Sequence, residues 1–192
     1  MEDQGIGPGA ASSQAQASGK ALGLSLSQHE VWLDQMAWPE SAHLNIGGGA
    51  FLHGRFDIKI FKAALQALVD ENQALRLVPD YSGGQVLLQH HEPELEIVDF
   101  CTSDTPQDDM RSWWNARIRQ PIPLGHKPPW RFSLLRGSED LHGLTIQFHH
   151  LVMDGWGTSL VMQRWSQIYG AIATGQGSAP DGLGGGGCGR DR

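Results

Sequence analysis

A run of alternating apolar and polar residues, 144–148, leads directly into two adjacent histidines and then into an Asp-Gly pair. Alternation with period two is typical of a β-strand, because successive side chains point to opposite faces of a sheet. The two faces of this expected strand carry Leu144, Ile146, Phe148 and His150 on one side, and Thr145, Gln147 and His149 on the other. We therefore expect the two imidazoles to point apart, which makes them poor candidates for ligands of one metal ion.

A helix is expected shortly after this strand. Thr158 is a helix-start residue, and apolar side chains then recur at helical spacing at Val161, Trp165, Ile168 and Tyr169. The order is thus strand, histidine, short loop, Asp154, Gly155 and helix. That layout suits an active-site turn, because rigid elements on both sides hold the side chains in place.

The rest of the chain alternates between helix-like and strand-like segments. Strands are expected at residues 45–53, 85–89, 95–98, 130–135 and 141–148, and helices at residues 24–36, 58–71, 110–119 and from 158 onward. Because strands and helices interleave, we predict an α/β or α+β fold, with helices packed on a sheet in a two-layer sandwich.

Composition suggests one folded unit between two polar segments. The first 20 residues are mostly Gly, Ala, Ser and Gln, and Gly again dominates after Gly175. Such segments bury too little apolar surface to offset chain entropy. We expect a disordered segment at residues 1–20, one lobe at residues 21–174 and a flexible tail at residues 175–192.

The charge and the cysteines narrow the classes of partner. The formal net charge is −7 and Lys and Arg form no stripe, so we expect neither a nucleic-acid partner nor a membrane partner. No apolar stretch approaches the roughly 20 residues of a membrane span, and no secretory signal is visible. Cys101 and Cys188 form no metal-binding pattern. We expect both to be free thiols in a cytoplasmic protein.

Residues 149–155, His-His-x-x-x-Asp-Gly, resemble the signature of the condensation domains of non-ribosomal peptide synthetases. That family has the chloramphenicol-acetyltransferase-like fold. Further segments resemble other family motifs in the expected order, at residues 24–32, 43–48, 71–76 and 129–132. In the third of these the usual Arg-His pair is replaced by Glu71-Asn72, so that only Leu75 and Arg76 match.

The resemblance implies a mechanism and roles for residues. Family members join two similar lobes around a tunnel, and this chain corresponds to the N-terminal lobe. Within the family, an amine carried on one phosphopantetheine arm attacks an acyl thioester carried on another. His150 would orient or deprotonate that amine, and the backbone N–H of Gly155 would face the developing oxyanion. Asp154 would pair with Arg76 to fix the turn, and His149 would be structural.

The same resemblance implies the partners, and it leaves alternatives open. We expect carrier proteins as partners, a second-lobe polypeptide or synthetase subunit, no directly bound cofactor and no metal. We also expect the chain to be inactive alone. One alternative is a non-catalytic remnant or interaction module that binds a carrier protein or a synthetase subunit. A glycerolipid acyltransferase and an epimerisation domain share parts of the histidine pattern and rank below the condensation domain.

Overall fold

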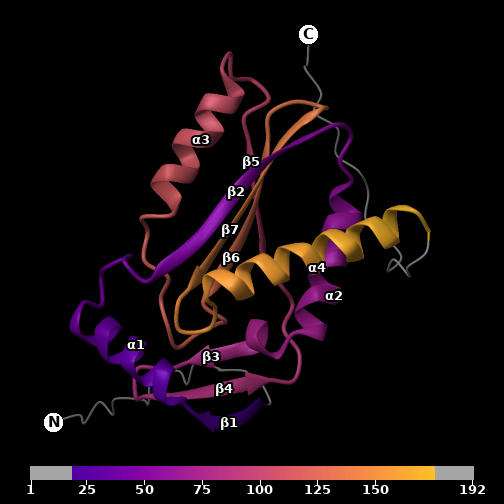
Figure 1. Ribbon diagram of the computed structural model, residues 1–192. Helices are drawn as coiled ribbons and strands as arrows, with labels where there is room; N and C mark the ends of the chain where they lie inside the picture. The colour runs from indigo at the N-terminus through magenta and orange to yellow at the C-terminus, as the bar shows by residue number, and fades with distance from the viewer. Residues whose placement is uncertain (1–18, 176–192) are drawn as a thin grey trace, which may run out of the picture.

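The computed structural model describes residues 19–175, which contain two β-sheets, four α-helices and one short 3-10 helix (Figure 1). In chain order the elements are β1 (Gly19–Gly23), α1 (Leu26–Ala37), β2 (Asn45–His53), α2 (Ile58–Glu71), η1 (Gln73–Arg76), β3 (Leu77–Pro79), β4 (Gly84–Leu88), β5 (Leu95–Asp99), α3 (Pro106–Arg117), β6 (Trp130–Arg136), β7 (Leu141–His149) and α4 (Gly155–Ala173).

The larger sheet has the strand order β2-β7-β6-β5. β7 pairs antiparallel with both of its neighbours, whereas β5 and β6 run parallel. A smaller antiparallel sheet, in the order β1-β4-β3, lies beside α1 at one end of the molecule (Figure 1). This mixture of strands and helices confirms the predicted α/β class.

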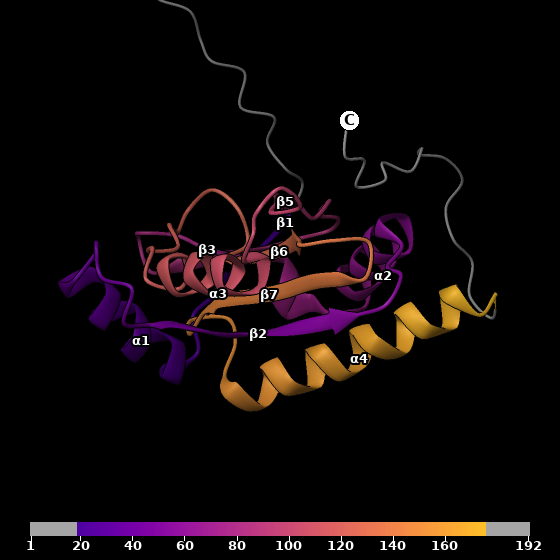
Figure 2. The same cartoon turned by 90° about the horizontal axis from the view of Figure 1, so that it is seen from above.

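Helices α2 and α4 pack together over one face of the larger sheet (Figure 2). In α2 the apolar residues Phe61, Leu65 and Leu68 recur at helical spacing, and all three are fully buried. They meet alternate residues of β7, Ile146 and Phe148 among them. Burying a side chain of this size contributes roughly 1.5–3 kcal/mol, so this layer is the main source of stability.

The opposite face of the larger sheet carries polar residues and lies against α3. Thr145 and Gln147 of β7 are both buried there. The amide Nε2 of Gln147 donates to the carbonyls of Ile118 and Gln120, at 3.3 and 3.2 Å, just after α3. Both faces of β7 are therefore covered, and the predicted alternation separates an apolar layer from a polar one, in which Gln147 is hydrogen-bonded and the hydroxyl of Thr145 has no partner among the described residues.

Strand β2 approaches β7 closely at Gly47. A Cβ atom placed on this residue would lie 2.1 Å from the carbonyl oxygen of Ile146, which no real side chain tolerates. A Cβ atom on the next residue, Gly48, would meet nothing within 4 Å. The glycine run in this strand thus contains one position where the absence of a side chain is essential to the pairing.

Some boundaries differ from those expected. Gly19 and Lys20, which we placed in a disordered segment, belong to β1. The last helix begins at Gly155, three residues before Thr158, because Asp154 caps it. The remaining expectations for residues 1–18 and 176–192 lie outside the described residues. Within residues 19–175, none of the helices combines the length and the apolar character that crossing a membrane requires.

The prediction for one cysteine is wrong. Cys101 is disulfide-bonded in the structure and is not a free thiol. Cys188 lies outside the described residues.

Candidate active site

The turn after β7 is anchored at both of its histidines. The backbone N–H of His149 donates to the carbonyl of Pro129 at 2.9 Å, and that of His150 donates to the carbonyl of Leu44 at 2.8 Å. The N–H of Val152 then closes the turn on the carbonyl of His149 at 3.1 Å. These bonds fix the direction in which the two imidazoles leave the strand.

His149 points into the protein, where it is 1% exposed. Its Nδ1 accepts a hydrogen bond from the backbone N–H of Leu151 at 3.1 Å. Its proton is therefore on Nε2, which donates to the side-chain oxygen of Gln35 at 2.8 Å. Burial, and then the nearby His150 and His43, lower the pKa of His149 to about 4. The ring is thus neutral near pH 7 and joins β7 to α1.

His150 is exposed, and its imidazole is oriented by the turn itself. Its Nδ1 lies 3.0 Å from the carbonyl oxygen of Met153. Because a carbonyl can only accept, Nδ1 is the donor and carries the proton. In the neutral ring the lone pair is then on Nε2, which leaves a proton acceptor available at the surface. As expected, the two histidines point apart.

Asp154 caps helix α4 and does not form the expected ion pair. Its Oδ1 accepts from the backbone N–H of Gly157 at 2.6 Å, and its carbonyl accepts from that of Thr158 at 2.9 Å. Arg76 instead donates to the carbonyls of Leu88 and Gln89, at 3.1 and 2.8 Å. No ion pair joins Asp154 to Arg76 among the described residues, so that expectation is wrong.

Gly155 is the first residue of α4 and follows His150 by five positions. The N–H groups of the first helical turn have no partner within the helix, and they lie at its positive end. The Asp154 side chain occupies the N–H of Gly157. The N–H of Gly155 directly follows Asp154 and is not the one that its side chain binds. A proton acceptor and a first-turn N–H are thus held a few residues apart.

A hollow of about 460 Å³ adjoins this turn. It lies between η1 and the first half of α4, where Met153 and Gly157 form part of its wall. Trp156, on the first turn of α4, is 74% exposed, and Leu160, one turn further on, is 49% exposed. His150 does not line this hollow itself, but Met153, whose carbonyl holds the imidazole, forms part of the wall.

Two glutamines that support the turn were not predicted from the sequence. Gln28 donates from Nε2 to the carbonyl of Leu151 at 3.1 Å, and it exchanges amide hydrogen bonds with Gln85. Gln35 is 4% exposed and holds the ring of His149. The two lie seven residues apart on α1 and hence on one face of the helix. The sequence does contain a feature that could have indicated these two residues, namely two amide side chains at helical spacing on an otherwise apolar face of the helix.

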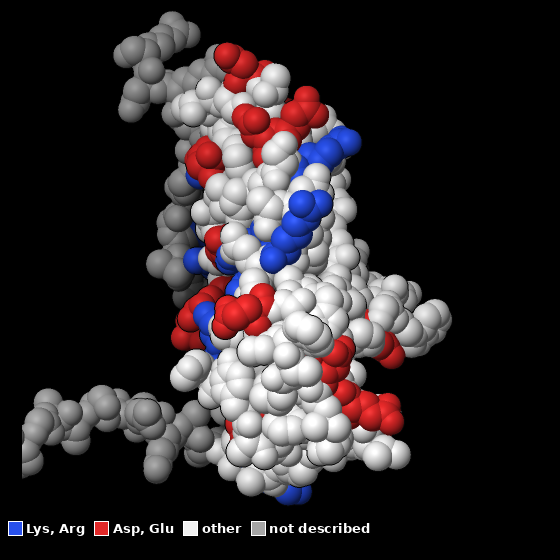
Figure 3. All heavy atoms as spheres, turned by 90° about the vertical axis from the view of Figure 1, so that its left-hand side faces the viewer, with Lys and Arg blue, Asp and Glu red and all other residues white. Residues whose placement is uncertain are grey.

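Neither metal-binding side chains nor a basic surface stands out. Among residues 19–175, no group of three or more His, Cys, Asp or Glu side chains could hold a metal ion. The face in Figure 3 shows Lys and Arg interspersed with acidic and uncharged residues, without a continuous basic stripe. The start of α3 is acidic, with Asp108 and Asp109 in its first turn.

Comparison with known proteins gives consistent matches. The family model described as Condensation domain matches residues 19–181. The chain is 33% identical over 159 residues to Nonribosomal peptide synthetase asqK of Emericella nidulans, an alignment that covers 81% of this chain and 6% of that protein. It is 32% identical over 156 residues to Nonribosomal peptide synthetase kk1B of Curvularia clavata, covering 79% of this chain and 1% of that one.

Among solved structures, the starter condensation domain of rhizomide synthetase RzmA is similar, with a TM-score of 0.74 and 28% identity. That match covers 86% of this chain and 41% of the other. The first condensation domain of the CDA synthetase has the same fold, with a TM-score of 0.71 and 23% identity over 84% of this chain and 42% of the other. The chain therefore spans less than half of these solved chains and a small part of the curated relatives.

Proposed function

The chain belongs to the condensation-domain family, and from that premise we propose that it takes part in amide-bond formation during non-ribosomal peptide synthesis. Its substrates are an acyl thioester and an aminoacyl thioester, each carried on the phosphopantetheine arm of a carrier protein. The observation that carries the proposal is the orientation of His150, whose Nδ1 proton is donated to the carbonyl of Met153.

In the proposed reaction, the amine of the acceptor attacks the thioester carbonyl of the donor. A nitrogen–carbon bond forms, the carbon–sulfur bond breaks, and the sulfur leaves as a thiol of the donor arm. Nε2 of His150 orients the amine, takes up its proton and passes it to the leaving sulfur, a contribution of roughly 10²–10⁴-fold in rate. The N–H of Gly155 faces the oxyanion and contributes about 2.7–4 kcal/mol where water is excluded.

The remaining motif residues support this arrangement without contacting substrate. His149 is buried and neutral near pH 7, and it ties the turn to α1. Asp154 caps α4 and so sets the position of Gly155. Arg76 holds the end of β4 through the carbonyls of Leu88 and Gln89. We propose a structural role for each of the three.

We further propose that the reaction needs a second lobe. His150 and the hollow beside α4 are open to solvent in this chain. An oxyanion contact is weak in water, because solvent competes for the same oxygen. A second lobe, supplied by the same gene product or by another polypeptide, would cover this surface. The chain alone is then expected to yield no amide.

The test combines the chain with a second-lobe polypeptide and two loaded carrier proteins. Mass spectrometry follows the amide product. We expect the wild-type chain to form it and His150→Ala to reduce the rate at least ~10²-fold while the melting temperature is retained. His90→Ala removes another exposed histidine outside the motif and is the matched control.

Equal rates for wild type and His150→Ala would reject the assigned role. Binding of loaded carriers without product, in the presence of a second lobe, would favour the interaction module instead. Product formed by the chain alone would reject the need for a second lobe.

A further inference from the structure

A second hollow, of about 330 Å³, lies where β5 and β6 begin. None of residues 149–155 lines it, so it is separate from the candidate active site. Its charged side chains are those of Glu94, Glu96, Arg117, Lys127 and Arg131. Three cations against two carboxylates leave one net positive charge, in a chain whose overall charge is −7.

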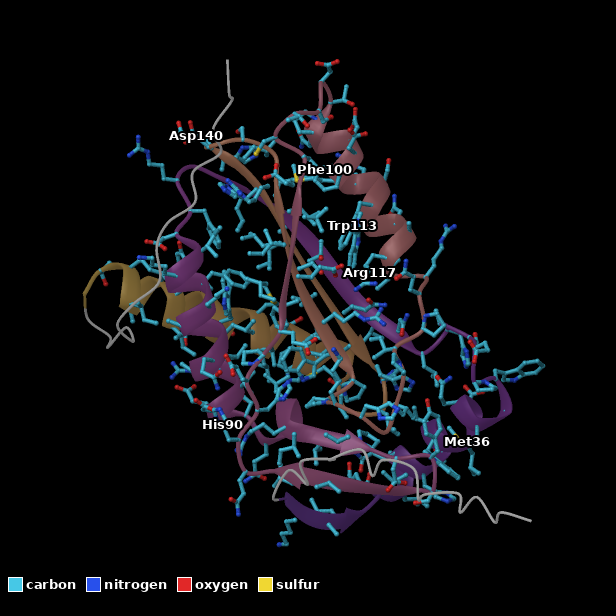
Figure 4. The ribbon with its side chains drawn as sticks, turned by 180° about the vertical axis from the view of Figure 1, so that it is seen from behind. Met36, His90, Phe100, Trp113, Arg117 and Asp140 are labelled. Atoms are coloured by element: carbon cyan, nitrogen blue, oxygen red, sulfur yellow. The ribbon has the colours of Figure 1, made fainter. Side chains whose placement is uncertain are left out.

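Both carboxylates of this hollow already have cationic partners. Glu94 is paired with Lys127, whose hydrogen bond lowers the pKa of that carboxyl group. Glu96 accepts from Nη2 of Arg117 at 2.8 Å and from the hydroxyl of Ser133 at 3.1 Å through the same oxygen, Oε2. Arg117 lies near the end of α3 with Trp113 one turn before it, on the side of the helix that faces the sheet (Figure 4).

Arg131 is the cation of this hollow that remains without a carboxylate partner among residues 19–175. It is partly buried, and its hydrogen bonds go to neutral oxygens. The bond to the carbonyl of Pro121 is 2.8 Å long, whereas those to Gln120 and Gln147 are 3.5 and 3.4 Å. The two longer bonds, both from Nη1, lie beyond the usual range for N–H···O bonds, so the guanidinium has one short hydrogen bond, from Nη2.

The surroundings of Arg131 disfavour its charge. Burial, and then the neighbouring Arg117, lower the pKa of Arg131. A guanidinium stays protonated in proteins, so it cannot relieve this by losing a proton. The carboxylate of Glu96 opposes these two effects only in part, since the net direction is downward. A partly desolvated cation whose hydrogen bonds all go to neutral groups is costly, and an anion bonded to it directly would reduce that cost.

We propose that this hollow binds a small organic carboxylate, with the guanidinium of Arg131 as its principal partner. The planar fork of arginine matches the two oxygens of a carboxylate, which favours this group over other monoanions. The volume lies near the lower end of the range for small-molecule sites. Trp130 and His91, whose rings meet edge to face at 5.5 Å, provide flat walls for the rest of the ligand.

The experiment titrates the full chain with sodium benzoate at constant ionic strength, with benzamide as the uncharged probe of the same shape. Binding is followed by two-dimensional NMR of the backbone and of the indole N–H of Trp130. We expect saturable shifts with benzoate that are confined to this hollow, and no saturable shift with benzamide. Equal binding of the two probes would overturn the proposal, as would shifts spread over the whole surface.

Two variants assign the site. Arg131→Gln is expected to weaken benzoate binding at least tenfold, whereas Arg55→Gln removes the same charge from an exposed position and leaves it within twofold. If Arg131→Gln does not fold, Arg131→Lys replaces it. We then expect the affinity for benzoate to fall at least threefold, because lysine lacks the planar guanidinium of arginine. Unchanged affinity in the folded Arg131 variant would reject the site. The measurement involves no carrier protein, so it does not depend on the proposed function.

Discussion

Nδ1 of His150 lies 3.0 Å from the carbonyl oxygen of Met153, three residues later in the same turn. The contact is made within the motif, so the orientation of the ring does not depend on a distant residue. A proton on Nδ1 leaves Nε2 as the acceptor, which is the state that a proton-accepting role requires. The three-residue spacing between His150 and Met153 thus lets the turn orient the imidazole by itself.

The two histidines should differ in tautomer. We expect the neutral ring of His150 to carry its proton on Nδ1 and that of His149 to carry it on Nε2, because Nδ1 meets a backbone carbonyl in the first and a backbone N–H in the second. Long-range ¹H–¹⁵N NMR of the imidazole nitrogens at about pH 7.5 distinguishes the two forms. An Nε2–H tautomer at His150 would contradict the orientation described above.

Stability should fall in mildly acidic solution because of His149. Its pKa is about 4 in the folded state and about 6.5 in an unfolded chain, so protons bind the unfolded state preferentially between these values. The stabilising contribution is complete above pH 6.5 and is lost as the pH falls toward 4. The loss is on the order of 3 kcal/mol.

Urea unfolding between about pH 4 and pH 7 measures this effect. His149→Gln should remove most of the additional slope with pH, since glutamine does not titrate, whereas the exposed-site variant His53→Gln should retain it. Identical slopes in wild type and His149→Gln would show that the ring is not held neutral.

Patterns within a short stretch of sequence predicted much of this fold. The alternation in β7 and the helical spacing in α2 indicated both elements, because each pattern reflects one buried face. The start of α4 was misplaced, because Asp154 was assigned to an ion pair and not to a helix cap. Aspartate can satisfy either role, and only the fold shows which partner is near.

Long-range partners could not be predicted in this way. Gln35 meets His149 across 114 positions, and Gln28 meets Leu151 across 123. Neither residue type signals its partner, since an amide bonds to almost any polar group. The family resemblance indicated which residues form the site, but not the glutamines that hold them.

Asp154 should act as a cap and independently of Arg76. Asp154→Ala is expected to destabilise the chain by about 0.5–2 kcal/mol, more than His150→Ala does, whereas Asp154→Asn should keep most of the stability because asparagine also caps helices. In a double-mutant cycle with Arg76→Ala, the two changes should add within about 0.5 kcal/mol. A larger coupling energy, measured by urea unfolding, would support the ion pair between Asp154 and Arg76 that was expected from the sequence.

Gly47 and Gly48 offer a matched pair of substitutions in β2. Gly47→Ala would force its Cβ against the carbonyl of Ile146, and we expect a loss of about 1–3 kcal/mol or more. Gly48→Ala adds the same methyl group where nothing lies within 4 Å, so its effect should be small. Thermal unfolding of both variants decides the matter, and equal melting temperatures would mean that β2 does not approach β7 as closely as described.

The connections between the strands of the larger sheet differ greatly in length. Residues 137–140 join β6 to β7, whereas residues 54–140 separate β2 from β7. Closing short loops costs less entropy, so we expect the β6–β7 hairpin to form first during folding and β2 to dock later. The histidine turn is held by Leu44, Gln35 and Gln28. All three belong to α1 or to the connection from α1 to β2, which we expect to dock together with β2. A chain lacking that segment could form the hairpin and still leave the imidazole of His150 without a fixed direction.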